Sequence, residues 1–191
     1  GRRCETRTVQ DRLLARPDWL GSDEAVSRRV PAPWTPLRVR SAPNGVRVRC
    51  WGRDHLFTPD AFLRQVHSLE RPLLDGPVAL TARVDGRPVR WRGATLRRLA
   101  SDPDQAVLVR EASAGPLAFR CDVEADFDGM LRFDWRITSS APVRVDALTM
   151  EIPVRADVAR YFYQYRGRCG DDRWMGRIPR GGLAKGFRPC V

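Results

Sequence analysis

Hydrophobic and polar residues alternate along much of the chain after residue 45. Val46, Val48 and Cys50 alternate with Arg47 and Arg49, which is the period-two pattern of a strand with one buried face. Further strands are predicted over 78–84, 106–112, 117–127, 130–138 and 143–154. Many short, evenly spaced strands are typical of a β-sandwich. The predicted fold class is therefore mainly β: an antiparallel two-sheet β-sandwich with one or two short helices.

Local signals add detail to this pattern. Asp85-Gly86 stands between two alternating runs and predicts a hairpin over 78–91. Within 143–154 the apolar residues change phase, which predicts a β-bulge near Asp146-Ala147. In 130–138 the alternation puts Phe133 and Trp135 in the core.

Helical spacing is found in a few places. Thr58 is a candidate N-cap for a short helix over 59–66. Residues 5–16 read as a short helix or a frayed arm, and 157–165 as a helical turn. The predicted organisation is an N-terminal arm and Pro-rich strap over 1–45, the β-sandwich over 46–165, and a Gly/Arg-rich tail over 166–191 that reads as a long loop.

The net charge of +11 raises the possibility of a nucleic-acid partner. All basic residues except Lys185 are arginine, a skew that is typical of a GC-rich genome. The net charge does not show whether the arginines cluster on one face, and a phosphate-binding face requires such clustering. Nucleic acid is therefore not the preferred partner. The sequence also lacks the long apolar run of a membrane span.

The five cysteines form no CxxC pair, so the sequence predicts no metal site. Cys50 and Cys121 fall on the apolar phase of predicted strands and are expected to be small buried side chains. Cys169 and Cys190 could form a disulfide in an exported protein. The compartment stays open, with export as one option. No nucleotide-binding glycine motif is present, and no cofactor is expected.

The acidic residues of 122–128 raise the question of catalysis. Asp122, Glu124, Asp126 and Asp128 share one phase of a strand. Residues two apart on a strand are separated by roughly 6.5–7 Å, close to the carboxylate spacing of inverting glycosidases. Every alternating strand with acids gives this spacing, so a solvated face is the preferred interpretation. No catalytic residue is assigned.

Aromatic and basic residues in predicted loops are the candidate contacts for a ligand or a neighbouring domain. They are Trp51, Arg53, His55, Tyr163 and Trp174. A packed structural role competes with ligand contact at His55.

Several short sequences, in order, resemble proteins of the glycoside hydrolase family 123-like group. They are Asp18–Gly21, Val30–Leu37, Trp51–Phe57, Leu73–Leu80, Met150–Val154 and Phe187–Pro189. The resemblance implies an N-terminal β-sandwich domain that precedes a catalytic barrel. In that family the catalytic residues are an adjacent Asp-Glu pair in the barrel. Asp23-Glu24 lies in the loop before the sheet, so this role is not transferred to it.

The resemblance therefore implies a noncatalytic domain of a protein that hydrolyses glycosidic bonds, with N-acetylhexosaminides as candidate substrates. The barrel would be its intramolecular partner and carbohydrate its partner through the parent enzyme, while this chain alone is expected to be inactive. The first alternative is a carbohydrate-binding module with an exposed aromatic platform, for which Trp51, Tyr163 and Trp174 are candidates. The second is a polyanion-binding domain, which requires arginines gathered on one face.

Overall fold

A computed structural model describes residues 17–23, 27–163 and 175–178. All regular secondary structure in these residues is β-strand, so the predicted fold class is confirmed. The strands are β1 (Arg38–Ala42), β2 (Gly45–Cys50), β3 (Arg53–Thr58), β4 (Ala61–Ser68), β5 (Arg71–Pro72), β6 (Ala79–Val84), β7 (Arg87–Pro88), β8 (Arg92–Ser101), β9 (Gln105–Ala114), β10 (Leu117–Asp126), β11 (Leu131–Ser139), β12 (Val145–Glu151), β13 (Tyr161–Tyr163) and β14 (Met175–Arg177).

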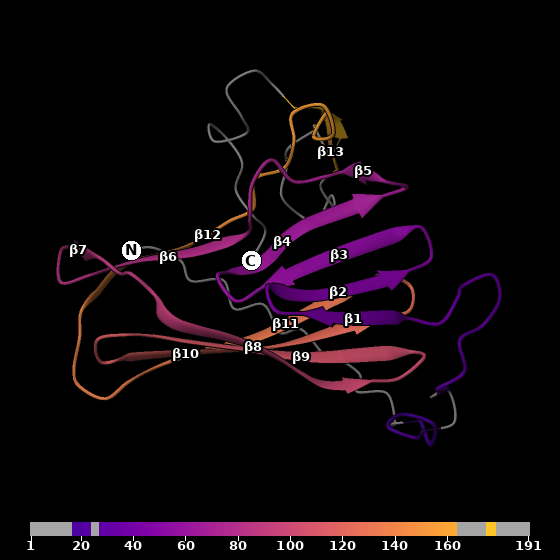
Figure 1. Ribbon diagram of the computed structural model, residues 1–191, viewed down its shortest axis with the longest axis horizontal. Coiled ribbons are helices and arrows are strands. Elements are labelled where there is room, and N and C mark those ends of the chain that lie inside the picture. The colour runs from indigo at the N-terminus through magenta and orange to yellow at the C-terminus, as the bar shows by residue number, and fades with distance from the viewer. Residues whose placement is uncertain (1–16, 24–26, 164–174, 179–191) are drawn as a thin grey trace, which may run out of the picture.

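The strands form two main layers (Figure 1). One layer is the sheet β1-β2-β3-β4-β5, extended by the small sheet β12-β6-β7. An antiparallel bridge between Leu63 and Val78 joins the two sheets. The other layer is the sheet β11-β10-β9-β8. Neighbouring strands are antiparallel throughout, as in a sandwich.

The core lies between these layers because each main sheet turns its apolar phase inward. Val48 and Phe57 come from the first layer, and Leu108, Phe119 and Val123 from the second. All five are at most 2% exposed. Burying a side chain of this size contributes about 1.5–3 kcal/mol, so the alternation in the sequence is what holds the two sheets together.

One arginine is part of this interior. Arg110 on β9 is 5% exposed, and its guanidinium carbon lies 5.3 Å from the ring centroid of Phe62 and 5.2 Å from that of Phe119. Its Nε donates a hydrogen bond of 2.8 Å to the carbonyl of Pro59. Burial lowers the pKa of the Arg110 guanidinium, but a guanidinium stays charged in proteins. The two ring faces and the carbonyl thus replace part of its hydration.

The predicted helix over 59–66 is wrong, because residues 61–68 form β4. Phe62, Leu63 and Val66 fit a helical face, but Ala61, Phe62 and Leu63 are all buried in succession. β4 is covered by the opposite layer and also joined to the start of β6 at Leu63, so three consecutive residues find apolar surroundings. A short apolar run of this kind does not distinguish a helix from a strand.

The predicted turn and bulge are confirmed. β6 and β7 are joined by Asp85-Gly86, with φ of 48° and 74°, as a type I′ turn requires. The return strand covers only Arg87–Pro88, and beyond it the amide of Val89 donates one further hydrogen bond of 2.8 Å to the carbonyl of Ala82. The register of β12 against β6 shifts between Val145 and Ala147, where the bulge was expected.

Two buried faces expected from the sequence are exposed instead. Trp135 on the edge strand β11 is 43% exposed, whereas Phe133 is partly buried against the core. Every residue of β12 is exposed. β11 and β12 each lie at the edge of a sheet. A side chain on the apolar face of such a strand can stay exposed, because no neighbouring strand covers it on one side.

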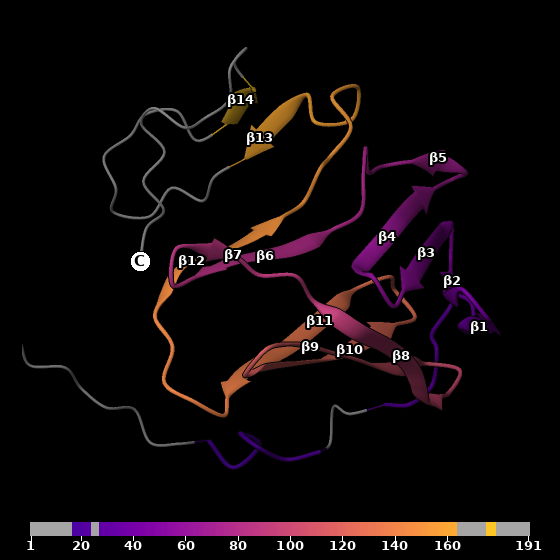
Figure 2. The same cartoon turned by 60° about the vertical axis from the view of Figure 1, so that its left-hand side comes forward.

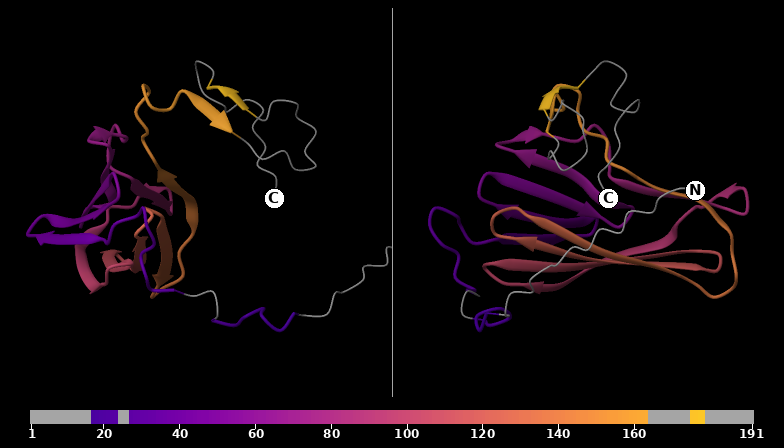
Figure 3. Two further views of the ribbon diagram at one scale, coloured as in Figure 1. Left: turned by 90° about the vertical axis from the view of Figure 1, so that its right-hand side faces the viewer. Right: turned by 180° about the vertical axis from the view of Figure 1, so that it is seen from behind.

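Residues 157–165 were expected to contain a helical turn and 166–191 a long loop. The structure instead places Tyr161–Tyr163 in β13, paired with β14 at Met175–Arg177. Figure 3 shows this yellow pair beyond the first layer and away from the β8–β11 layer. The predicted helix over 5–16 and the rest of the tail lie outside the described residues. The described part of the chain contains no apolar helix of membrane-spanning length.

Candidate functional site

Three turns meet at the end of the sandwich where β2 runs into β3 (right-hand end of Figure 1). Trp51-Gly52 joins β2 to β3, Leu69-Glu70 joins β4 to β5, and 127–130 joins β10 to β11. The amide of Leu69 donates a hydrogen bond of 2.8 Å to the carbonyl of Gly52. These turns bring residues distant in the sequence together at one end of the fold.

Trp51 lies at the tip of the first turn, beside the Pro-rich strap. Its ring centroid is 6.3 Å from that of Trp34, in an edge-to-face arrangement. Trp34 is in turn 5.9 Å from Phe127 of the β10–β11 turn. Trp51 is 56% exposed and Trp34 36%. Edge-to-face packing of this kind stabilises aromatic pairs, so the strap holds the indole of Trp51 while leaving much of it accessible.

A depression of about 660 Å³ opens beside this aromatic cluster. It is lined by Trp34, Trp51, Gly52, Arg53, Ser68, Leu69 and Asp128. Its walls offer an indole ring, a guanidinium, a hydroxyl and a carboxylate. This mixture of a flat apolar face and polar groups suits a polar ligand with a ring, such as a sugar.

Arg53 is held in place by the β10–β11 turn. Its Nη1 donates a hydrogen bond of 2.9 Å to the carbonyl of Asp128. Gly129 makes this approach possible, because a Cβ at that position would lie 2.6 Å from the same Nη1. Gly129 also has φ of +87°, a conformation that favours glycine. The guanidinium is therefore positioned by backbone contacts and not only by its own rotamer preference.

The Leu69-Glu70 turn is built from unfavourable residues. Their φ values are 47° and 68°, and left-handed backbone is uncommon for residues with a bulky side chain. Leu69 is also 83% exposed, so core packing does not account for a leucine there. Strain of this kind is concentrated at functional sites, and Leu69 lines the depression beside Trp51.

His55 is not available to a ligand. It is 3% exposed, on the inner face of β3 opposite Val48 of β2. Burial lowers the pKa of its imidazole below the ordinary value of 6.5, because a charged ring loses its hydration there. The packed structural role is the one observed, and His55 leaves the candidate site.

Of the other two candidates, only Tyr163 is among the residues that the structure describes. Tyr163 ends β13, which lies apart from the three turns in Figure 1. Trp174 lies outside the described residues. Trp51 and Arg53 therefore stay as the candidates that share one depression.

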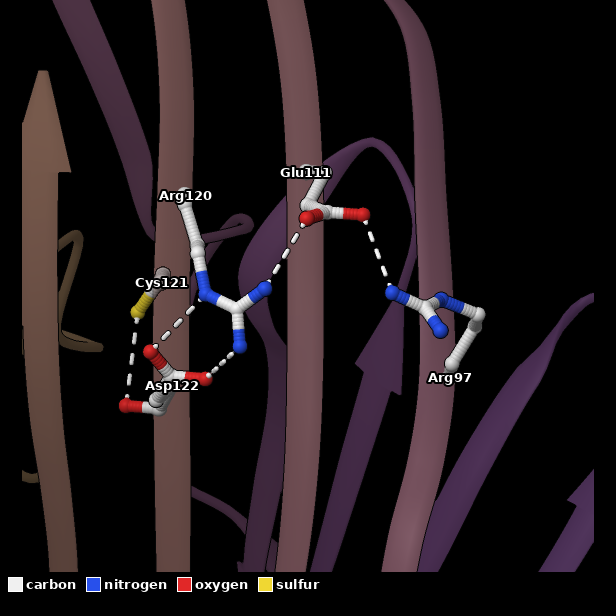
Figure 4. Close-up of polar contacts among 5 residues, drawn as sticks. All are labelled: Arg97, Glu111, Arg120, Cys121 and Asp122. Carbon is white, nitrogen blue, oxygen red and sulfur yellow. Dashed lines mark hydrogen bonds and ion pairs between the residues drawn. The ribbon is translucent and has the colours of Figure 1, made fainter. Parts of the chain in front are cut away.

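Two acidic residues of β10, Asp122 and Glu124, are engaged by arginines, and Figure 4 shows the contacts of Asp122. Arg120 Nη2 lies 2.7 Å from Asp122 Oδ1, and its Nη1 lies 3.1 Å from Glu111 Oε1. Arg97 reaches the other oxygen of Glu111 at 3.1 Å. Carboxylates held in this way on an open face are paired with arginines and have no partner suited to proton transfer. The solvated face preferred from the sequence is the arrangement observed.

Cys50 and Cys121 are free and buried, as expected. Burial raises the pKa of the Cys121 thiol to about 12 and also raises that of Cys50. A thiol that stays protonated is a poor nucleophile. Within the described residues, no group of His, Cys, Asp or Glu has the arrangement of a metal site.

Trp34, Leu69 and Asp128 were not among the candidates from the sequence. Trp34 lies in the Pro-rich strap, and its aromatic partners Trp51 and Phe127 are 17 and 93 positions away in the chain, so local sequence does not reveal them. For Asp128 the Asp-Gly at 128–129 signals a turn, but not its contact with Arg53. Nothing in the sequence around Leu69 indicates that it lines a depression.

The chain matches a protein-family model. Residues 43–173 match the family model described as glycoside hydrolase 123, third domain. No curated protein matches the chain. Because the description refers to a third domain, the N-terminal position expected from the sequence is not confirmed.

Proposed function

We propose that this chain, which belongs to the glycoside hydrolase 123 family, is a noncatalytic β-sandwich domain of a glycoside hydrolase-like protein. Hydrolysis of the glycosidic bond is then carried out by a catalytic barrel that this chain does not contain. N-acetylhexosaminides are the substrate class implied by the family resemblance. The family match over 43–173 is the observation that carries this proposal.

The state of the carboxylates supports a noncatalytic role. A glycosidase needs one carboxyl group that can donate a proton and a second that acts as base or nucleophile. Asp122, Glu111 and Glu124 instead form ion pairs with Arg120, Arg97 and Arg132 on a single open sheet face. These ion pairs make the three carboxylates part of a charged surface, which supports the noncatalytic role.

An exposed apolar surface on β11 and β12 supports attachment to another domain. Figure 2 shows these strands, which end their respective sheets, at the same side of the two layers. The exposed apolar residues there are Trp135, Val145, Leu148, Met150, Ile152 and Val154. Several exposed apolar side chains at two neighbouring sheet edges favour a contact site, because large exposed apolar surface marks such sites in soluble proteins. The barrel of the same protein is the proposed occupant.

The first test is turnover by the purified chain. We expect no hydrolysis of aryl N-acetylhexosaminides or of other aryl glycosides. Turnover that disappears in Asp122→Asn or Glu124→Gln would contradict the noncatalytic role.

The second test concerns the β11–β12 surface. Leu148→Gln with Met150→Gln should reduce binding of a hydrophobic dye while leaving the melting temperature nearly unchanged, because both residues are already exposed. Leu80→Gln is the matched control: Leu80 is 7% exposed on β6, and its replacement should cost about 3 kcal/mol. Equal destabilisation by the surface pair and the control would show that the surface is part of the core.

Carbohydrate binding by the domain itself is a second candidate function, favoured by the exposure of Trp51 beside a polar depression. Trp51→Ala should then remove binding to immobilised glycans. Trp135→Ala, which removes an indole that is 43% exposed elsewhere, should not. Equal loss in both variants would count against this site.

A further inference from the structure

Arginines are gathered on the outer face of β1 and β2. In the antiparallel register Arg38 lies opposite Arg49, and Arg40 lies opposite Arg47. Directly opposed residues project from the same face of a sheet, so four guanidinium groups share one small area. Like charges in this position destabilise a strand pair. The arrangement therefore has no explanation in the stability of the sheet.

Little negative charge offsets these arginines. Asp54 on β3 accepts a hydrogen bond of 3.0 Å from Arg47 Nη1 and one of 2.9 Å from Arg49 Nε, both at Oδ2. This carboxylate is shared by two cations. Arg38 and Arg40 form no ion pair with any residue that the structure describes. The face consequently keeps an excess of positive charge with free guanidinium donors.

These arginines line a depression of about 510 Å³, together with Arg64, Leu56 and Thr58. A second depression, of about 540 Å³, shares Arg47 and Arg49 with the first. It reaches Gly52, Arg53 and Leu69, which also line the depression beside Trp51. The three depressions thus follow one another across the sheet, from an arginine-rich area to an exposed indole.

The arginines of this surface favour a linear polymer ligand that carries negative charges. Guanidinium groups bind carboxylate and sulfate groups with paired hydrogen bonds. Arginines two residues apart on a strand are separated by roughly 6.5–7 Å, so a ligand must carry repeated charges to engage several of them. A linear polymer with one anionic group at regular intervals meets this requirement.

The surface favours a polysaccharide over a nucleic acid. Proteins that bind single strands stack successive bases on aromatic rings, but no Trp, Tyr or Phe lines the two arginine-rich depressions, and His67 is the single ring among their lining residues. The single indole at one end, Trp51, suits stacking of one sugar ring.

We propose that the outer face of β1–β4 binds an acidic polysaccharide, with uronate carboxylates or sulfate groups held by Arg38, Arg40, Arg47 and Arg49 and one sugar ring beside Trp51. This inference rests on the proposed role in a carbohydrate-active protein and adds the chemical class of the glycan.

The test measures dissociation constants of the whole chain for defined polymers. Oligogalacturonate offers carboxylates alone and dextran sulfate offers sulfates alone. Methyl-esterified oligogalacturonate and dextran are their neutral counterparts, and an oligothymidylate of matched charge represents nucleic acid. We expect binding to at least one anionic glycan, weakened by salt, and none to the neutral polymers. Which anionic glycan binds more tightly identifies the anionic group.

The diagnostic variant is Arg38→Gln with Arg40→Gln, because neither residue has an ion pair whose loss would disturb the fold. It should weaken binding about tenfold for each arginine removed, as expected for charge-assisted hydrogen bonds. Arg97→Gln with Arg132→Gln removes the same charge from the opposite layer and should change binding less than about twofold. A melting curve verifies that both variants fold.

Absence of binding to both anionic glycans would overturn the inference, as would an equal loss in the two double variants. Tighter binding to the oligothymidylate at equal salt would overturn it in favour of nucleic acid. Glycan binding and turnover are measured separately. A chain without turnover that binds no acidic glycan would therefore refute this inference and leave the noncatalytic role intact.

Discussion

The arginines on the outer faces of the two layers differ in the charges of the residues that surround them. On the β8–β11 layer, Arg97 and Arg120 share Glu111, and Arg120 also pairs with Asp122. On the β1–β4 layer, Arg38 and Arg40 face Arg49 and Arg47, with Asp54 as the carboxylate between the latter two. The same residue type therefore neutralises carboxylates on one face and accumulates charge on the other.

This difference shows why the total charge of the chain is a poor guide to its partners. A net charge of +11 is compatible with arginines scattered over the whole surface. The strand register decides which of them meet carboxylates and which meet each other. On the β8–β11 layer the arginines form exposed ion pairs, which contribute little to stability. On the β1–β4 layer the excess positive charge is able to attract anions.

Removing the arginine between the layers should have the largest effect on stability. Arg110→Ala takes away a side chain packed on Phe62 and Phe119 and leaves the carbonyl of Pro59 without its donor. We expect a loss of about 3 kcal/mol in the free energy of unfolding, measured by denaturant titration.

Arg110→Met is the matched control for this variant. It keeps most of the packing volume and should lose less, since a buried charge is costly and its replacement by an apolar group is often tolerated. A loss below about 1 kcal/mol for Arg110→Ala would show that the interior arginine resembles those on the faces.

Sequence patterns predicted the parts of the fold that depend on neighbouring residues. The alternation at 45–50, the Asp85-Gly86 turn and the bulge at Val145/Ala147 all follow from local phase or turn chemistry. β4 was mistaken for a helix because its burial depends on contacts with two sheets. Trp135 was misplaced because edge position is a property of the assembled sheet.

The candidate site was less accessible to sequence reasoning. Trp51 and Arg53 were identified from an aromatic loop, and they share one depression. His55, two residues further along β3, is on the same face as Arg53, but it lies deeper in the sheet, opposite Val48, and is buried there. The arginine pairs of β1 and β2 depend on the register across the Pro43-Asn44 turn, which alternation alone does not define.

A smaller effect is expected from the inner face of β3. The pKa of His55 is lowered by burial, so the unfolded chain binds a proton at a higher pH than the folded chain does. Stability is therefore fully present above the ordinary pKa of 6.5 and falls as the pH decreases below it. Thermal melts between about pH 7 and pH 5 should show this decrease.

His55→Gln should flatten this pH dependence, while His67→Gln, a change on the adjacent strand β4, should retain it. An unchanged profile in His55→Gln would mean that other groups cause the decrease. This comparison separates the inner face of the first layer from its charged outer face.

The smallest expected effect bears directly on the two outer faces. Arg40→Gln relieves repulsion from Arg47 and breaks no ion pair, so stability should rise by about 0.2–0.5 kcal/mol at low salt. Arg120→Gln on the opposite layer breaks contacts with Glu111 and Asp122, and its stability should change in the other direction. Added salt screens both effects and should bring the two variants toward the parent chain. Melting curves of the three proteins at low and high salt measure this, and a decrease in stability for Arg40→Gln at low salt would contradict the difference between the faces. The sign matters more than the size, because a face that is stabilised by losing an arginine retains that arginine for a reason other than the stability of the fold.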